Sequence, residues 1–434
     1  MKKIHLAVII GICGIVLFAA ILIALWPNAG QQGTNADRPV LKVALYPYFD
    51  DVNGDAHATT ISLLKERYHA LYPDDELEIY ISDEYNTYLT DCRNYSSVFG
   101  PGGPDIVEVE QTVLDNLRED GYIQPFVPGS PGAEQMLKEN RVHVVDPYEN
   151  IGIVENRVYF VPTWLCAHYT FVRNPPGTAP ESGDFSSNGT LPDLYLSAYA
   201  STCGSDPVRL EGAVRDAVNG SPDPEVIDWF SYRLSACTNT TGENRCLNGY
   251  YAEDGGISDF VSGKTDRYVG FSEMLYTIIR ESPKGHDNNL TISGTIYGKG
   301  TWPSLAWVDG FVMNNNTPAE KTDQAIRFID FYNRPDVKAI LALSRDARDQ
   351  KERVPRYLLP ASEDFYLLPE VSSDPYYQQF YPVIRTMTPF PTGGLRGNMG
   401  AIYCNVTSAL RENGMDMTCP AGGCTCSAGT AIPA

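Results

Sequence analysis

Residues 41–81 read LKVALYPYFDDVNGDAHATTISLLKERYHALYPDDELEIYI and hold the clearest alternation of strand and helix patterns in this 434-residue chain. Residues 41–48 and 77–81 are short apolar runs that predict strands, and residues 58–72 have the spacing of an amphipathic helix. Its apolar face is predicted to carry Ile61, Leu64, Tyr68 and Leu71. Strand, helix and strand in this order predict a βαβ unit, so we expect an α/β fold with a parallel sheet.

A second unit of the same kind follows. The turn GGPD at residues 102–105 precedes a predicted strand at 106–109 and a predicted helix at 112–120. Ligands of open α/β sheets bind at the carboxyl ends of the strands, which places Glu110 at the edge of a site. The alternative is a solvated charge at the start of a helix.

The rest of the chain is less regular. Residues 175–265 are an insertion rich in Gly, Pro, Ser and Asn. After it, residues 268–271 and 305–313 predict strands, and residues 319–332 have helical periodicity.

The N-terminus predicts entry into the secretory route. Residues 4–26 contain no Asp, Glu, Lys or Arg and follow Lys2 and Lys3, so they predict a signal anchor, with a cleaved signal peptide as the alternative. Residues 27–39 form a linker. The remainder is expected to be lumenal or extracellular, secreted or tethered through residues 4–26. Sequons that fit a glycoprotein occur at Asn94, Asn188, Asn219, Asn239, Asn289, Asn315 and Asn405.

Nine cysteines follow the apolar segment, and an oxidising compartment favours pairing them. Eight would form disulfides if Cys166 stays free, although Cys92 is another candidate for the odd thiol. The cysteines expected to pair include Cys203, Cys237, Cys246, Cys404, Cys419, Cys424 and Cys426. We expect no metal site, because CxxxxCxC at 419–426 is better explained by disulfides and the histidines have no metal-binding spacing.

The formal charge of -21 excludes neither enzymes nor binding proteins, but it argues against nucleic acid and anionic membrane surfaces as partners. A cationic small ligand would be attracted, although acidity also keeps a secreted protein soluble. The glycine-rich stretch GGLRGNMG at 393–400 lacks the Lys-Ser/Thr of a phosphate-binding loop and is interpreted as a flexible loop.

Cys166 lies in VYFVPTWLCAHYTFVRN, residues 158–174. A cysteine attacks only as thiolate, so a nucleophilic role requires a base, and the sequence offers two. His168 is two residues away on an extended strand, whereas Glu273, in VGFSE at 269–273, can meet Cys166 only through the fold. A buried, inert thiol is the alternative.

Aromatic and acidic residues recur at the ends of the predicted strands. The aromatic ones are Tyr46, Tyr48, Tyr85, Trp164 and Trp307. Flat rings recognise flat or cationic ligands through stacking and cation–π contacts. Glu110 or Asp309 would suit an aminopyrimidine, whose exocyclic N–H a carboxylate accepts. Ordinary packing is the alternative for each ring.

Taken together, these segments resemble thiaminase I (thiamine pyridinylase). The resemblance covers residues 41–365 and rests on KVALYPY (42–48), DIVEVE (105–110), GYIQPF (121–126), VYFVPTWLC (158–166), VGFSE (269–273) and YLLPA (357–361). It implies the two-lobed fold of type II periplasmic binding proteins, with parallel-rich mixed sheets and a ligand cleft between the lobes. The implied parts are lobe 1 at 40–160 and 295–345, lobe 2 at 161–294 and 346–415, and a Cys-rich tail at 416–434.

The resemblance also implies roles and partners. Cys166 would add to C6 of the aminopyrimidine of thiamine, with Glu273 as general base. The thiazole would then leave and an amine or thiol co-substrate would replace it, without a cofactor. Tyr46, Tyr48 and Tyr85 would line the cleft with Trp307, and Glu110 and Asp309 would hold the ring. We expect a monomer.

The chain departs from the family pattern at three of these positions. Glu110 stands where the pattern has Asp, and Phe271 and Trp307 where it has tyrosine. An added methylene and a lost hydroxyl change the depth and polarity of a pocket, so they bear on which substrates fit. Two other hypotheses of function also stay open. One is a binding protein for thiamine or another small solute that performs no chemistry, and the other is a hydrolase that uses Cys166 with His168.

Overall fold

The computed structural model describes residues 39–87, 95–173, 191–235, 255–282 and 289–415. The predicted apolar segment at 4–26, nearly all of the linker and the tail at 416–434 lie outside these ranges. Within the described ranges, no helix has the length and apolar character needed to cross a membrane.

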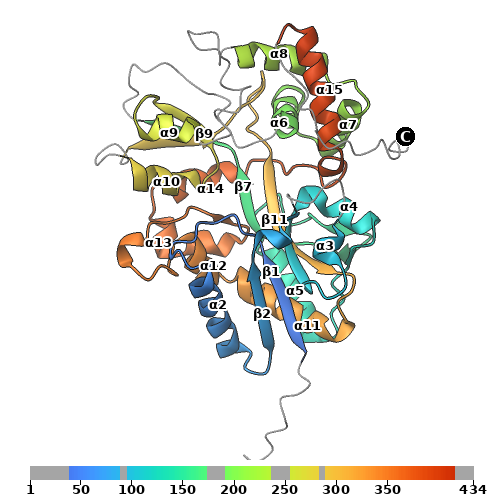
Figure 1. Cartoon of the computed structure of the whole chain (residues 1–434), viewed down its shortest axis with the longest axis vertical. Helices are drawn as coiled ribbons and strands as arrows, with labels where there is room; N and C mark the ends of the chain where they lie inside the picture. Colours follow the sequence, from blue (N-terminus) through green and yellow to red (C-terminus); the bar gives the residue numbers. More distant parts are fainter. Residues whose placement is uncertain (1–38, 88–94, 174–190, 236–254, 283–288, 416–434) are drawn as a thin grey trace, which may run out of the picture. The chain divides into compact units, whose positions relative to one another are not determined.

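A mixed sheet runs through the middle of Figure 1 in the order β12-β7-β11-β3-β1-β2, with β4 paired to β11. Its strands are β1 (Val40–Leu45), β2 (Glu76–Ile81), β3 (Ile106–Glu110), β4 (Ile123–Gln124), β7 (Val161–Ala167), β11 (Ala306–Asn314) and β12 (Leu359–Pro360). β1 pairs with β2 and with β3 in parallel, which confirms the parallel pairing predicted for the βαβ unit. β11 runs antiparallel to its neighbours β3 and β7.

Two details of the first unit differ from the prediction. β1 ends at Leu45 because Pro47 has no N–H for a ladder and the Tyr46 N–H donates to Glu108 Oε2 at 3.0 Å. Helix α2 (Ala58–Leu71) buries Leu64 and Tyr68 as predicted, but Leu71 is exposed because it stands in the last turn, at the edge of the packed face.

Smaller sheets and many helices complete the chain. β8 (Tyr169–Arg173) pairs antiparallel with β9 (Arg267–Gly270) and β10 (Leu290–Gly294), and β5 (Ile153–Val154) pairs with β6 (Arg157–Val158). The other helices are α3 (Ser96–Phe99), α4 (Leu114–Glu119), α5 (Pro131–Val142), α6 (Leu191–Cys203), α7 (Pro207–Val218), α8 (Pro224–Ser235), α9 (Gly255–Val261), α10 (Met274–Glu281), α11 (Thr322–Asn333), α12 (Pro335–Ala342), α13 (Pro369–Ser372), α14 (Tyr377–Ile384) and α15 (Met399–Glu412).

The stretch at 175–265 is more regular than its composition suggests. Its described part contains α6, α7, α8 and α9. Leu210, Val214 and Ala217 share the buried face of α7, and Asp206 caps this helix by accepting the N–H groups of Val208 and Arg209. With α15, helices α6, α7 and α8 gather at the top of Figure 1 and supply most of a second buried cluster, whereas α9 packs into the cluster around the main sheet.

Cysteines and sequons divide differently from the prediction. Among the described cysteines, Cys166 and Cys203 are free thiols and Cys404 is in a disulfide. The pairing predicted for Cys203 is therefore wrong, because the end of α6 holds this thiol half-buried beside its own helix. The other six of the nine cysteines that follow the apolar segment lie outside the described residues. The sequon at Asn405 has a structural use, since its Nδ2 donates to Ala217 O at 2.9 Å and to Val218 O at 3.0 Å.

Candidate active site

Three neighbouring strands bring Glu110, Cys166, Trp307 and Asp309 together. β11 lies between β7 and β3, and its register sets Trp307 opposite Cys166. Asp309 lies opposite Glu110 on β3 and opposite Trp164 on β7. The register between β11 and β7 shifts between Asp309 and Gly310, so the regular ladder is interrupted next to this row of residues.

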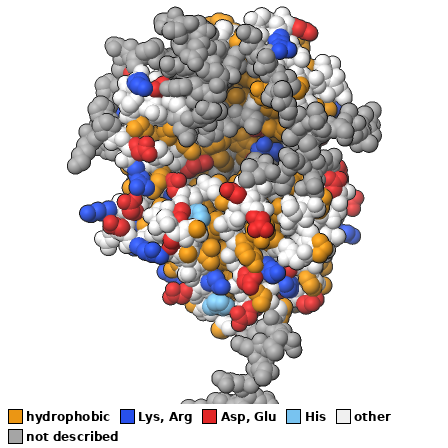
Figure 2. Space-filling view, viewed as in Figure 1, with side chains coloured by type: hydrophobic (Ala, Val, Ile, Leu, Met, Phe, Trp, Pro, Cys, Tyr) orange, Lys and Arg blue, Asp and Glu red, His pale blue; other side chains and the backbone are white. Residues whose placement is uncertain are grey.

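A cavity of about 310 Å³ lies against this row. Its lining residues are Tyr46, Tyr48, Glu110, Trp164, Leu165, Cys166, Asp193, Phe271, Ser272, Glu273, Trp307, Asp309, Leu358, Leu359 and Arg396. The predicted site residues are among them except Tyr85 and the alternative base His168. Tyr85 stands in a short 3₁₀ turn with its ring 5.4 Å from that of Tyr80. On the face drawn in Figure 2, hydrophobic side chains gather across the middle, and Lys and Arg are interspersed with Asp and Glu.

Cys166 and Glu273 both line the cavity. Burial raises the pKa of the Cys166 thiol well above its usual range, and the negative charges of Glu273, Asp309 and Glu110 raise it further. Burial raises the pKa of Glu273 to about 7. The thiol is therefore protonated at neutral pH, and the carboxylate that acts on it electrostatically has a pKa suited to accept its proton.

Two carboxyls face the cavity from adjacent strands. Burial raises the pKa of Asp309, and the negative charges of Glu110 and Glu108 add to the shift. Asp309 Oδ1 has no hydrogen-bond partner among the described residues. Burial also raises the pKa of Glu110, but Arg396 opposes this, with its Nε 3.2 Å from Glu110 Oε1. Glu110 is thus a partnered carboxylate, whereas Asp309 keeps an acceptor for a ligand.

Two buried charged residues, Glu108 and Lys338, lie behind the cavity wall. Glu108 accepts hydrogen bonds from Thr163 Oγ1 at 2.6 Å and from the Tyr46 N–H, and burial raises its pKa to about 7. Lys338 Nζ lies 3.7 Å from the centre of the Trp164 ring and has no hydrogen-bond partner within the described part of the chain. Burial lowers the pKa of Lys338, while Glu108 and Asp309 oppose that shift. No local sequence pattern points to either residue.

His168, the other candidate base, packs among aromatic rings. It does not line the cavity, and its ring packs 4.7 Å from Phe271 and 5.0 Å from Trp307. Its Nδ1 lies 3.1 Å from Tyr297 Oη, and burial lowers its pKa to about 3. A histidine with so low a pKa is a weak base, so this geometry favours Glu273 over His168 as the partner of Cys166.

Asp193 and Arg396 are lining residues that the sequence did not identify. Asp193 lies in the first turn of α6, inside the insertion. Arg396 begins a 3₁₀ turn in the glycine-rich stretch at 393–400, which is an ordered part of the cavity wall rather than a free loop. Neither residue has a local motif, because each reaches the cavity only through the packing of distant segments.

No group of three or more His, Cys, Asp or Glu side chains in the described ranges is arranged to hold a metal ion.

Comparisons with known proteins identify the fold. Thiaminase I of Clostridium botulinum in complex with thiamin aligns with a TM-score of 0.64 and 16% identity, covering 86% of this chain and 100% of that one. The chain has the fold of thiaminase I. The enzyme from Bacillus thiaminolyticus aligns with a TM-score of 0.60 and 17% identity over 86% of this chain and 100% of its own.

Binding proteins share the same architecture. The maltodextrin-binding protein MalE1 from L. casei aligns with a TM-score of 0.59 and 14% identity, covering 87% of this chain and 94% of that one. No family model matches the chain, and no curated protein matches its sequence. The predicted resemblance to thiaminase I is confirmed for the fold, and because one fold serves both enzymes and binders, function must be argued from the cavity.

Proposed function

We propose that this protein is a thiaminase I-like transferase that exchanges the thiazole of thiamine for an amine or thiol. The observation that carries the proposal is the pairing of Cys166 and Glu273 in one cavity, with the pKa of Glu273 raised to about 7. A binder needs neither a thiol nor a base beside it.

The reaction follows from these groups. Glu273 takes the proton of the Cys166 thiol, and the sulfur bonds to C6 of the aminopyrimidine. The thiazole leaves with the electron pair of its bond to the bridging methylene. The co-substrate nitrogen or sulfur then bonds to that carbon and releases its own proton to solvent. The bond between sulfur and C6 breaks, and Glu273 returns the proton to the thiolate.

Recognition of the ring uses the remaining lining residues. Tyr46 and Tyr48, whose ring centres are 4.9 Å apart, and Trp307 would flank the aminopyrimidine. The acceptor on Asp309 Oδ1 would take a ring or exocyclic N–H, and Glu110, held by Arg396, would complete the polar wall. Four acidic side chains against one arginine on the wall would attract the cationic thiazolium.

The two-lobed arrangement is part of this proposal. Lining residues such as Trp164 belong to the cluster around the main sheet, whereas Trp307 belongs to the cluster built by the helices. A cleft between two lobes would have walls of this mixed origin.

We also propose that the protein acts outside the cell or in a lumen.

A solute-binding protein is the second candidate. It is supported by the binding proteins of the same fold and by the aromatic walls of the cavity, which suit any flat ring.

The test is to incubate the purified chain with thiamine and aniline and to follow products by mass spectrometry. Free thiazole together with the anilino-pyrimidine, both absent with Cys166→Ser, is the expected result. Binding of thiamine without either product would leave the solute-binding reading and refute the transferase.

A further inference from the structure

A second, smaller cavity adjoins the first. It measures about 80 Å³, and Tyr48, Glu273 and Leu358 line both cavities. The remaining walls are Phe49, Asp50, Met274, Thr277 and Arg356. One water molecule requires roughly 10–15 Å³ of cavity volume. This side cavity therefore has room for a ligand of a few non-hydrogen atoms and not for a second thiamine. Glu273 thus stands between a large compartment that contains Cys166 and a small one that does not.

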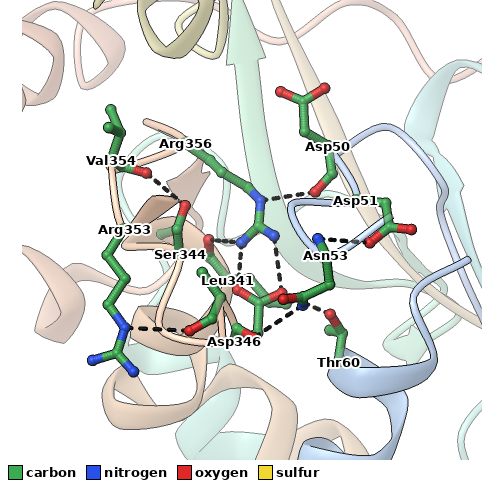
Figure 3. Close-up of polar contacts among 12 residues, drawn as sticks. Asp50, Asp51, Asn53, Thr60, Leu341, Ser344, Asp346, Arg353, Val354 and Arg356 are labelled. Carbon is green, nitrogen blue, oxygen red and sulfur yellow. Dashed lines mark hydrogen bonds and ion pairs between the residues drawn. The ribbon is translucent and has the colours of Figure 1, made fainter. Parts of the chain in front are cut away.

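Arg356, the positively charged residue on the wall of the side cavity, is already paired with a buried carboxylate. Arg356 is 1% exposed, and its Nη1 and Nη2 lie 2.7 and 2.9 Å from the two carboxylate oxygens of Asp346. Its Nη1 also donates to Leu341 O at 2.8 Å, and its Nε donates to the backbone oxygen of Asp50 at 3.1 Å. Figure 3 shows the guanidinium directed at Asp346, so its charge is neutralised inside the protein.

The Asp50 carboxylate on the same wall is not neutralised in this way. In Figure 3 the Asp50 carboxylate points away from Arg356, which holds only the backbone of this residue. Asp50 is exposed, so the side cavity opens to solvent beside a negative charge. Asp50 also acts electrostatically on Glu273, which indicates that the two carboxyls face the same space.

We propose that the side cavity is the subsite of the second substrate, a small primary amine that enters as its ammonium ion past Asp50 and attacks the methylene from beside Glu273. This inference rests on the proposed transferase function and names the class of its co-substrate. Phe49, Met274 and Leu358 would contact the alkyl part of the amine.

The proton balance is closed by groups already named. The ammonium ion loses one proton to solvent and becomes a nucleophilic amine. Its nitrogen bonds to the methylene carbon as the aromatic ring re-forms and the bond between sulfur and C6 breaks. Glu273 returns its proton to the Cys166 thiolate, and the extra proton on the new nitrogen passes to solvent at the open side of the cavity.

Steady-state kinetics of the full chain test the subsite, with methylamine as a cationic probe and aniline as a neutral one. Asp50→Asn removes one charge from the entrance and is expected to raise the KM for methylamine several-fold, about 3- to 10-fold for a charge pair near the surface, and to change that for aniline little. Thr277→Leu fills the side cavity and is expected to raise the KM for both amines. The KM for thiamine should change less than twofold in each variant.

Glu281→Gln is the matched control, because Glu281 is an exposed acid at the far end of α10 and lines neither cavity. If thiazole is released but Asp50→Asn and Thr277→Leu leave the KM for methylamine as in the wild type, the subsite is wrong while the transferase stands. The same holds if they raise the KM for thiamine equally. If no amine releases thiazole from the wild type, the transferase fails and the subsite fails with it.

Discussion

The pH dependence of the first reaction step should reveal Glu273 as the base. Its pKa is raised to about 7 from an ordinary value of 4.5, so the carboxylate loses its charge as pH falls through about 7. With that pKa, roughly 9% of the group is ionised at pH 6 and roughly 91% at pH 8. If only the ionised form accepts the thiol proton, kcat/KM for thiamine should rise about tenfold between these pH values.

The assay measures kcat/KM for thiamine between pH 5 and 9 with aniline as the acceptor, because this ratio reports ionisations of the free enzyme. Glu273→Gln has nearly the same volume and cannot accept the proton, so we expect a loss of about 10²- to 10⁴-fold and no remaining inflection near pH 7. An inflection near 4.5, or one that survives in Glu273→Gln, would refute the assignment of this base. Alkylation of Cys166 by iodoacetamide gives an independent readout, since only the thiolate reacts.

Two further predictions concern buried charges. Arg356→Met leaves Asp346 buried without its cation and should lower the free energy of unfolding by about 3–5 kcal/mol, whereas Arg345→Met, which removes an exposed ion pair, should cost at most about 1 kcal/mol. Equal urea midpoints for the two variants would contradict this. Lys338→Met removes a positive charge that lowers the pKa of Asp309, so the pKa of Asp309 should rise further and thiamine affinity at pH 7 should fall. An unchanged dissociation constant in a fluorescence titration would show that Lys338 has no such effect; thermal melting serves as the folding control.

Local patterns predicted the elements that depend on nearby residues. The helix at 58–72 and the strands at 77–81 and 305–313 were found within one residue, because their apolar periodicity is the same property that buries them. Helices α6, α7 and α8 were missed, because the frequency of Gly, Ser and Asn across the insertion hid the apolar face that packs against α15. Composition averaged over a long stretch is a weaker guide than spacing within it.

The candidate site could be predicted only where a residue follows a strand. Glu110, Cys166, Asp309 and Glu273 each stand in or just after a strand, and the sheet brings such positions together whatever their distance in sequence. Arg396 reaches the cavity from a segment 286 residues away from Glu110, and no local pattern identifies such a contact.

Buried carboxyls that lower the stability of the folded protein help to decide between catalysis and simple binding. Burial raises the pKa of Glu108 and of Glu273 from 4.5 to about 7, so keeping either one ionised at pH 8 costs roughly 3 kcal/mol of folding free energy. A binder could recognise a flat ring with neutral amides at no such cost. Glu273, Asp309 and Glu110 instead all act electrostatically on one thiol, and a carboxyl whose pKa has been shifted to the working pH, as that of Glu273 has, is useful when a proton must move. The presence of destabilising buried carboxyls beside Cys166, more than the fold, supports an enzyme.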